Sequence, residues 1–475
     1  MKRFLRLFFA FSFSLFTYFC SAQYTTLLTF TGSNGEFPAG EDGLMLWGNV
    51  LYGMTGGGGI MGDTMGNMFS IHTDGTHFRQ LLVFNGTNGS YPSSPLMLSS
   101  GGGKTLYGMT YGGNLQGVYG NVFCIDTDGA NYKNLHVFND TNGGVPAGIM
   151  VITGNSLYGV AYSGGIYNGG CVFSLHIDGT GYKDLFDFAG ANGFGPQGGL
   201  TLLGNVLYGM TTYGGANGAG TIFSIDTDGN GYRDLFDFGG GSNGSEPFGS
   251  LTFYGNKFYG MTAVGGPNSY GNIFSIDTNG NDYKDLFDFN GTYGEEPFGS
   301  LIISGSVLYG MAQHGGADSN GCIFSIDTDG SGYKDLYDFT VYGEIPGGNL
   351  TLSGDMLYGM VNNSAGRPND GVLFSFKDTY GGLGVNEVKS ENQEVTVYPN
   401  PNNGVFNLVL ASETKQSPNT VEVYNVLGEK VYSQFSTFNS QLSINLSNQP
   451  NGIYLYRVLT ESGQLIGEGK AILQR

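Results

Sequence analysis

The sequence predicts an all-β protein, a seven-bladed β-propeller closed by its N-terminal strand and followed by a small C-terminal β-sandwich. Three observations support this prediction. The 475 residues include 85 glycines and 14% are aromatic, which suits short strands joined by tight turns because glycine weakens helices. One pattern occurs seven times, at intervals of about 50 residues. Each copy reads as four short strands without helical periodicity, as in a propeller blade.

Two landmarks define the repeat. The first is Leu-Tyr-Gly-Met or a close variant, found at 51–54, 106–109, 157–160, 207–210, 258–261, 308–311 and 357–360. The second resembles Ile-Phe-Ser-Ile and is centred on Phe69, Phe123, Phe173, Phe223, Phe274, Phe324 and Phe374. In the repeat at 250–289, turn residues between apolar runs predict strands at 251–253, 257–261, 273–277 and 283–289.

The phase of the repeat predicts how the ring closes. Most repeats end with a strand of the type Tyr-Lys-Asp-Leu-Phe-Asp-Phe, but the seventh stops at Ser375-Phe376-Lys377 without one. A strand of that type, 24–30, instead opens the exported chain. A ring in which 24–30 completes the last blade explains both facts. An open solenoid would leave a lone strand at one end and an incomplete unit at the other.

Basic side chains in the repeats gather at one position. Six of them start the fourth strand of a repeat: Arg79, Lys133, Lys183, Arg233, Lys284 and Lys334. Charges protect exposed edge strands from unwanted pairing, so this strand is predicted to be the outermost in each blade. A ring of basic binding sites is the alternative, which the neighbouring acids Asp184, Asp234, Asp285 and Asp335 disfavour.

The first 22 residues have the parts of a secretory signal peptide. Lys2, Arg3 and Arg6 precede an apolar run at 7–19, and small residues lead to a cleavage site between Ala22 and Gln23. The run is shorter than the roughly 20 residues of a membrane anchor, and no transmembrane segment is expected elsewhere. Lipidation of Cys20 is an alternative that bulky Phe19 disfavours. The repeat domain is then 23–378, followed by a polar linker at 379–394.

The balance of charge excludes some classes of partner. With 39 acidic and 19 basic residues, the formal net charge of −20 disfavours nucleic acid and anionic lipid. The cysteines of the exported chain, Cys124, Cys171 and Cys322, have no metal-type spacing. We expect them to be half-buried small strand side chains. The protein is expected to be a monomer without a metal or cofactor.

Residues that could carry chemistry are few. The turn from Asp226 to Asp234 spaces its acids as calcium loops do, but its Gly229 comes too early, and Asp-Gly is also a favoured hairpin turn. The five histidines share no repeat position, and His314 reads as a solvated loop residue. No catalytic residue is assigned and the ligand-binding residues are unknown. Paired carboxylates in the channel, as in glycoside hydrolases, stay an open alternative.

The last 81 residues, 395–475, differ in composition from the repeats, with less glycine and alternating strands that predict a β-sandwich. Their short motifs are formed by Tyr398, Pro399, Asn400, Pro401, Gly404, Phe406, Gly452, Ile453, Tyr454 and Lys470. The order of these motifs resembles the type A sorting domain of the type IX secretion system of Bacteroidetes. This resemblance implies interaction with the secretion machinery, export across both membranes, and a secreted or cell-surface location.

The repeats at 43–376 resemble the glycine-rich GloVer tandem repeat, a family without established chemistry. We therefore expect an exported or cell-surface, non-enzymatic protein that binds glycan or protein partners through loops such as Asn85–Pro92. The alternative is a secreted hydrolase or lyase that acts on polysaccharides.

Overall fold

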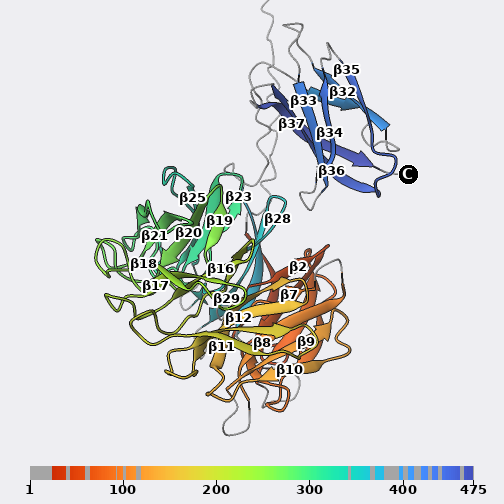
Figure 1. The fold of residues 1–475 in the computed structure, drawn as a ribbon. Coiled ribbons are helices and arrows are strands. Elements are labelled where there is room, and N and C mark those ends of the chain that lie inside the picture. Colours follow the sequence, from red (N-terminus) through yellow and green to blue (C-terminus); the bar gives the residue numbers. More distant parts are fainter. Residues whose placement is uncertain are drawn as a thin grey trace, which may run out of the picture. The chain divides into compact units, whose positions relative to one another are not determined.

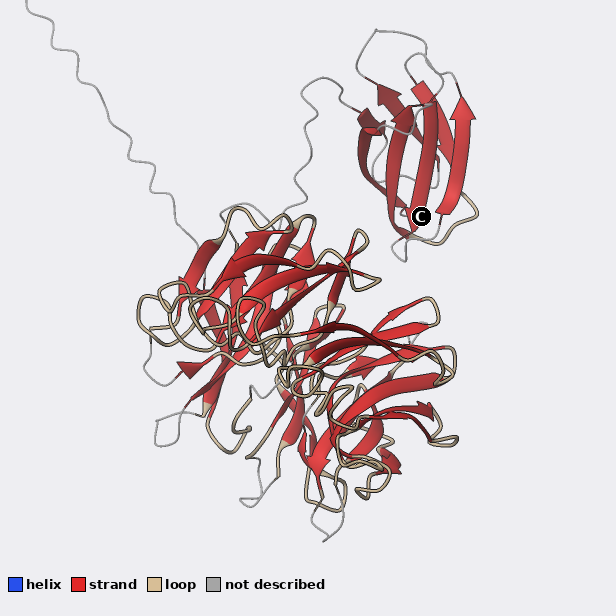
Figure 2. Cartoon of the chain, turned by 60° about the vertical axis from the view of Figure 1, so that its left-hand side comes forward, coloured by secondary structure: helices blue, strands red, loops and turns tan. Residues whose placement is uncertain are grey.

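The computed structural model describes residues 24–38, 43–58, 65–92, 94–99, 103–113, 119–340, 344–363, 370–378, 395–398, 405–410, 419–425, 430–436, 441–460 and 465–473. All regular elements in these ranges are β-strands (Figure 2). They contain no helix that is long and apolar enough to cross a membrane. The chain divides into two compact units, Met1–Leu383 and Gly384–Arg475. The predicted signal peptide with its cleavage site at Ala22 and Gln23, and the predicted linker 379–394, lie outside the described residues.

The described residues of the first unit form seven antiparallel sheets, one for each repeat (Figure 1). The first repeat forms a sheet of β2 (Met45–Trp47), β3 (Val50–Thr55), β4 (Asn67–His72) and β5 (Arg79–Val83). The second contains β6 (Ser90–Pro92), β7 (Met97–Leu98), β8 (Thr105–Gly112), β9 (Asn121–Asp126) and β10 (Lys133–Val137). The third contains β11 (Gly144–Thr153), β12 (Ser156–Ser163), β13 (Cys171–His176) and β14 (Lys183–Asp187).

The next three sheets keep the same strand order. The fourth repeat contains β15 (Thr201–Leu203), β16 (Val206–Thr211), β17 (Thr221–Asp226) and β18 (Arg233–Asp237). The fifth contains β19 (Thr252–Tyr254), β20 (Lys257–Thr262), β21 (Asn272–Asp277) and β22 (Lys284–Asp288). The sixth contains β23 (Ile302–Ser304), β24 (Val307–Ala312), β25 (Cys322–Asp327) and β26 (Lys334–Asp338). The four strands predicted within 250–289 are therefore confirmed, with ends that differ by one or two residues.

The sheet of the seventh repeat takes its outer strand from the N-terminus. It contains β27 (Glu344–Ile345), β28 (Thr351–Ser353), β29 (Met356–Asn363), β30 (Gly371–Lys377) and β1 (Tyr24–Phe30). β1 pairs antiparallel with β30, from Tyr24 opposite Phe376 to Phe30 opposite Gly371. Phe30 is fully buried in a core cluster that combines residues of the first and seventh repeats. These two repeats lie side by side, as β2 and β28 do in Figure 1.

The two sequence landmarks form a single contact inside each sheet. In the fourth repeat, Gly209 of β16 lies opposite Phe223 of β17, and the Phe223 ring covers the glycine. A Cβ atom added to Gly209 would lie 2.6 Å from Phe223 Cζ and 3.0 Å from Leu200 Cδ2. Gly53, Gly108, Gly159, Gly260, Gly310 and Gly359 meet their phenylalanines in the same way. The glycine of Leu-Tyr-Gly-Met is therefore the space into which the phenylalanine of Phe-Ser-Ile packs.

This contact gives a prediction about stability. Gly209→Ala should lower the free energy of unfolding by about 1–3 kcal/mol, because the added methyl group overpacks the site around Phe223. Gly241→Ala is the matched control, since a Cβ there meets nothing within 4 Å. Urea unfolding of both variants measures the difference. Equal stability of the two would contradict this account of the repeated glycine.

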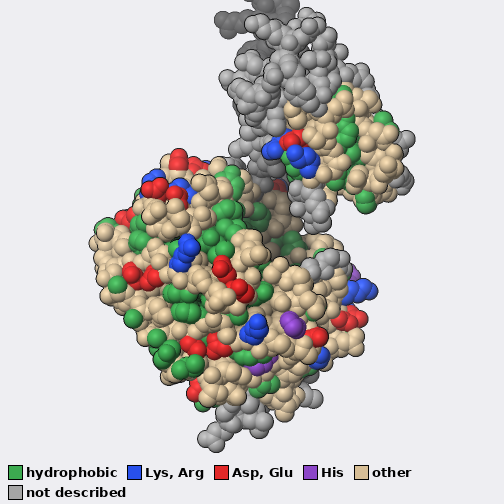
Figure 3. Space-filling view, in the orientation of Figure 1, with side chains coloured by type: hydrophobic (Ala, Val, Ile, Leu, Met, Phe, Trp, Pro, Cys, Tyr) green, Lys and Arg blue, Asp and Glu red, His purple; other side chains and the backbone are tan. Residues whose placement is uncertain are grey.

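The six repeated basic residues start the fourth strands, which lie at sheet edges, as predicted. Three of them also reach the turn of the next repeat: Arg79, Lys133 and Lys284 donate to the backbone carbonyls of Asp128, Asp178 and Asp329. On the face in Figure 3, charged side chains of this unit are scattered in ones and small groups rather than gathered in one large patch.

The expectation for the cysteines was partly wrong. Cys124 is half-buried, but Cys171 and Cys322 are completely buried thiols without a disulfide. Both start the third strand of a sheet and face the core between neighbouring repeats. Their burial raises the pKa of both thiols well above its usual range.

The second unit consists of two antiparallel sheets around its own core. One sheet contains β31 (Val395–Tyr398), β32 (Val405–Leu410) and β35 (Gln441–Asn445). The other contains β33 (Asn419–Asn425), β34 (Lys430–Ser436), β36 (Gly452–Thr460) and β37 (Leu465–Leu473). Phe406, Val421, Ile444 and Val458 are fully buried between the sheets, so this unit has the predicted β-sandwich outline.

Candidate functional site

The long loops of the repeat unit lie at one end of its sheets. Because neighbouring strands are antiparallel, the loop after the second strand and the loop that enters each repeat meet at the same end. They pair there through short bridges such as Phe194 with Tyr213 and Glu295 with His314. We call this end the loop face. The tight turns between the first and second strands and between the third and fourth strands form the opposite end, the hairpin face.

A backbone clamp joins neighbouring repeats on the loop face. The N–H of Glu246 donates to the carbonyl of Ala219 in the preceding repeat (3.1 Å), and its own carbonyl accepts from the N–H of Ala263 (3.0 Å). Glu246 has a φ of 57°, in the left-handed region that non-glycine residues rarely adopt. Equivalent pre-proline positions have the same φ sign: Phe37, Tyr91, Val145, Gly195 and Glu296. The two bonds, to the segments just before β17 and just after β20, offset this strain.

Exposed aromatic side chains concentrate on the loop face. They come from both kinds of loop and include Phe37, Tyr91, Tyr111, Tyr119, Tyr167, Phe194, Tyr270 and Tyr293. Tyr167 is 63% exposed, beside Ile166 at 77%. Large exposed apolar side chains that gather in one region mark interaction surfaces, and tyrosine combines an apolar ring with a hydrogen-bonding hydroxyl.

Four titratable side chains converge on the loop face, two of them at the same pre-proline position of consecutive repeats. Glu246 and Glu296 enter consecutive repeats, and burial followed by the charge of Glu296 raises the pKa of Glu246. His314 Nε2 lies 3.6 Å from Glu296 Oε2. Burial and the nearby Glu246 carboxylate raise the pKa of Tyr213. This cluster holds a carboxyl group with a raised pKa beside a second carboxylate, an imidazole and a phenol.

Other carboxyl pairs are part of the repeat itself. On the outer strands of the third, fifth and sixth repeats, Asp184, Asp288 and Asp335 each lie beside a second aspartate, at 187, 285 and 338. Burial and that second carboxylate raise the pKa of all three to about 6. Because the arrangement recurs in these sheets, it belongs to the scaffold.

The aspartates with calcium-like spacing are used to build turns. Asp228 Oδ1 accepts from the N–H of Asn230, two residues on (2.9 Å), and Asp74, Asp178 and Asp329 do the same in their repeats. The hydroxyls of Thr76, Thr180 and Ser331, followed by these backbone bonds, lower the pKa of Asp74, Asp178 and Asp329. The backbone and side-chain bonds from Asn230 lower the pKa of Asp228. Among the described residues, no group of three or more His, Cys, Asp and Glu side chains is arranged to hold a metal ion.

The residues of the predicted sorting motif do not form one site: some lie in the core of the second unit and others are exposed on its strands. Phe406 and Tyr454 are core residues, and the Tyr454 hydroxyl donates to the carbonyl of Pro450. Ile453 and Lys470 are exposed on β36 and β37, and Gly452 starts β36. Tyr398 ends β31. Pro399, Asn400, Pro401 and Gly404 lie outside the described residues.

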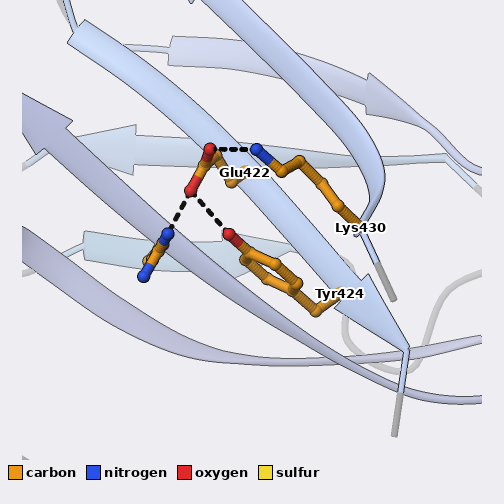
Figure 4. Close-up of polar contacts among 4 residues, drawn as sticks. Glu422, Tyr424 and Lys430 are labelled. Carbon is orange, nitrogen blue, oxygen red and sulfur yellow. Dashed lines mark hydrogen bonds and ion pairs between the residues drawn. The ribbon is translucent and has the colours of Figure 1, made fainter. Parts of the chain in front are cut away.

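A charged cluster on the second unit was not anticipated from the sequence. Buried Glu422 on β33 accepts from Lys430 Nζ (2.6 Å), Tyr424 Oη (2.7 Å) and Arg457 Nε (2.6 Å), as Figure 4 shows. The Arg457 guanidinium also lies 5.1 Å from the centre of the Tyr424 ring. The bonds from Lys430, Tyr424 and Arg457 lower the pKa of Glu422 to about 2.

This cluster predicts how the sorting unit responds to acid. Because the pKa of Glu422 is lower in the folded chain than its usual 4.5, its contribution to stability is present above about pH 4.5 and lost towards pH 2. Glu422→Gln should lower the unfolding free energy by about 1–2 kcal/mol at pH 7 and have little effect near pH 2. Ser433→Ala, at an exposed residue of β34, is the control. A pH-independent difference in thermal unfolding would contradict the role of the charge.

Comparison with protein families is decisive for the repeats. The model of the Gloeobacter/Verrucomicrobia repeat matches residues 13–215, 106–303 and 154–374, together about three quarters of the chain. The chain belongs to the Gloeobacter/Verrucomicrobia repeat family. In this family member, residues 396–473 match the secretion system C-terminal sorting domain. The sorting domain indicates export through the type IX secretion system, to the cell surface or into the medium, and hence interaction with that machinery.

Three solved structures resemble this Gloeobacter/Verrucomicrobia repeat protein. The extracellular domain of a one-component system from B. thetaiotaomicron has 10% identity and a TM-score of 0.48, with 96% of this chain and 59% of that one covered. YCF48 bound to D1 peptide has 10% identity and a TM-score of 0.47, with coverage of 76% and 96%. A Bacteroides fragilis protein described as a 6-phosphogluconolactonase has 14% identity and a TM-score of 0.39, with coverage of 64% and 88%. No curated protein matches the chain.

Proposed function

We propose that this exported repeat protein is a non-enzymatic binding protein that holds a glycan or protein partner on its loop face. The concentration of exposed tyrosine and phenylalanine side chains at that end supports the proposal most directly. Flat aromatic rings on short loops provide contact area at a low cost in conformational entropy. The loops also carry many asparagines, whose amides suit hydroxyl groups of sugars and peptide groups alike.

We propose for the scaffold a seven-bladed propeller that β1 closes. A repeated contact supports this arrangement. Thr201 Oγ1 donates to the carbonyl of Leu251 in the next repeat, Thr252 does so to Leu301, and Thr351 of the last repeat does so to Leu44 of the first. The last and first repeats thus make the same inner-strand contact as consecutive repeats.

A binding screen with matched variants tests the proposed function. The exported chain is applied to a glycan array and to envelope proteins of the producing cell, and the strongest partner is titrated. Tyr91→Ala combined with Tyr167→Ala should weaken binding at least tenfold. Tyr254→Ala, at a comparably exposed tyrosine on the hairpin face, should leave binding unchanged. Equal loss in both variants would remove the loop face from the proposal.

A second candidate function is the cleavage of polysaccharides. It is favoured by the Glu246, Glu296, Tyr213 and His314 cluster, since glycoside hydrolysis needs one carboxyl group as proton donor and a second as base or nucleophile. Glu246, with its raised pKa, is the proton donor in this reading. Turnover of a polysaccharide panel that Glu246→Gln abolishes, while Asp288→Asn preserves it, would replace the binding proposal with this one.

Three further features are proposed from the sequence. A signal peptide is cleaved between Ala22 and Gln23, the protein is a monomer, and it needs neither metal nor cofactor. N-terminal sequencing of the secreted protein tests the cleavage site, and light scattering tests the oligomeric state. A rise in melting temperature on adding calcium would overturn the third feature.

A further inference from the structure

A surface cavity of about 310 Å³ lies between the fourth and fifth repeats, on the hairpin face. The fourth repeat supplies Tyr208, Ser224, Asp226 and Arg233 to its polar lining, and the fifth supplies the turn residues Thr278 and Asn279. Val206 and Leu235 form its apolar part. Two features of this interface differ from those at several of the other interfaces between repeats.

The first altered contact involves the tyrosine of Leu-Tyr-Gly-Met. Hydroxyls of three counterparts bond the threonine in the turn of the following repeat: Tyr52 to Thr127, Tyr259 to Thr328 and Tyr358 to Thr73. Six counterparts of Tyr208 are buried, with 8% or less exposed: Tyr52, Tyr107, Tyr158, Tyr259, Tyr309 and Tyr358. Tyr208 is more exposed.

The side chain that Tyr208 contacts departs from the repeat. Phe258 stands where the other repeats have leucine, and the ring of Tyr208 packs against it at 4.6 Å between centroids. Tyr208 thus packs against the core cluster that contains Phe258, and Thr278 lines the open cavity beside it.

The two charged groups of the cavity, Arg233 and Asp226, also lack the side-chain contacts that some of their counterparts make within the described residues. Arg79, Lys133 and Lys284 donate to a carbonyl of the next turn, but Arg233, like Lys183, makes no such bond within the described residues. Asp226 has no side-chain partner in the part of the chain that the structure describes, whereas its counterpart Asp277 pairs with Lys257 at 2.6 Å. Gly231 keeps the carboxylate accessible, since a Cβ there would lie 2.8 Å from Asp226 Oδ2.

We infer that this cavity binds one neutral pyranose unit of a glycan. Adjacent sugar hydroxyls can donate to the Asp226 carboxylate while they accept from the Arg233 guanidinium, and Ser224 and Asn279 can take part in the same pattern. The C–H face of the ring fits against Val206, Leu235 and the edge of Tyr208. The volume lies at the lower end of the roughly 300–1,000 Å³ range of ligand sites, which suits a single ring.

The charges of Arg233 and Asp226 favour a neutral ligand over a cationic or an anionic one. Arg233 repels a cation, and Asp226 together with the net charge of −20 disfavours an anionic sugar. A neutral ring is compatible with both groups. The inference rests on the glycan-binding form of the proposed function and adds a second, separate site on the hairpin face, which its own variants can test.

The test uses the full exported chain and the methyl glycosides of neutral hexoses and N-acetylhexosamines, followed by ligand-detected NMR and calorimetry. Arg233→Gln and Asp226→Asn should each weaken binding at least tenfold. Lys183→Gln and Asp126→Asn, the equivalent changes in other repeats, should leave it unchanged. Phe258→Leu should also abolish binding without loss of thermal stability, because Tyr208 can then approach Thr278 and close the cavity.

Three outcomes would overturn the inference. The first is that none of these glycosides binds, and the second is that only uronic acids bind. The third is binding that the loop-face variant Tyr91→Ala with Tyr167→Ala removes while the Arg233 and Asp226 variants retain it. This last result would leave the proposed function intact and refute the hairpin-face site, so the two proposals can fail separately.

Discussion

Deletion of residues 395–475 should leave the repeat unit folded but trapped in the periplasm. The second unit has its own buried core around Phe406, Val421 and Val458, and the two units are separately compact. Units of this kind fold independently, so the melting temperature of the repeat unit should change little. Surface display or secretion, however, should be lost almost completely because the sorting domain is gone.

The measurement is the fraction of protein that reaches the cell surface or the medium, from protease accessibility of intact cells and from fractionation. The Glu422→Gln variant is a useful comparison, since its sorting domain is present but less stable. Export of the truncated protein at the level of the full chain would disprove the assignment of the tail.

Removal of β1 should have the second large effect. In a chain that starts at Gly32, the seventh sheet loses its outer strand, the ladder to β30 and the fully buried Phe30. Tyr24 is lost as well, and its ring stacks on Tyr337 at 4.4 Å and on Phe374 at 5.2 Å. Burial of one large apolar side chain is worth about 1.5–3 kcal/mol, so the total approaches the lower end of the roughly 5–15 kcal/mol that stabilises a domain.

Limited proteolysis should locate this effect at the seventh repeat. The shortened chain should be cut within 357–376 before the middle repeats are attacked. Thr25→Ala combined with Thr26→Ala is the control, because both threonines are exposed on β1. Phe30→Ala alone should give an intermediate result, with a loss of about 3–5 kcal/mol. Equal protection of 357–376 in the shortened and full chains would refute the proposed closed ring.

The strands could be predicted because their signals are local. A glycine in Leu-Tyr-Gly-Met and a phenylalanine in Phe-Ser-Ile recur at fixed spacing, and turn residues mark where each strand ends. Burial across repeats could not be predicted in the same way. Cys171 and Cys322 read as half-buried small residues, since nothing near them in the sequence indicates that they face the core between neighbouring sheets.

The candidate sites depend on contacts between repeats and were largely missed. Glu246 and Glu296 occupy loop positions that look ordinary in each repeat, and His314 read as a solvated loop residue. The signal that was available is the departure from the repeat. Phe258 in place of leucine marks the hairpin-face cavity. A glutamate directly before proline in each of two consecutive repeats, Glu246 and Glu296, marks the loop-face cluster.

The backbone clamp at the residues before Pro92, Pro146, Pro196, Pro247 and Pro297 has a consequence for how such proteins diversify. The clamp uses only main-chain groups, so it does not depend on the side chain at that position, which is Tyr91, Val145 or Glu246 in different repeats. Mutation there changes the chemistry of the loop face one repeat at a time while the join between repeats is kept. Each of these repeats thus offers one position at which the side chain can vary while the main-chain contact to the neighbouring repeat stays the same.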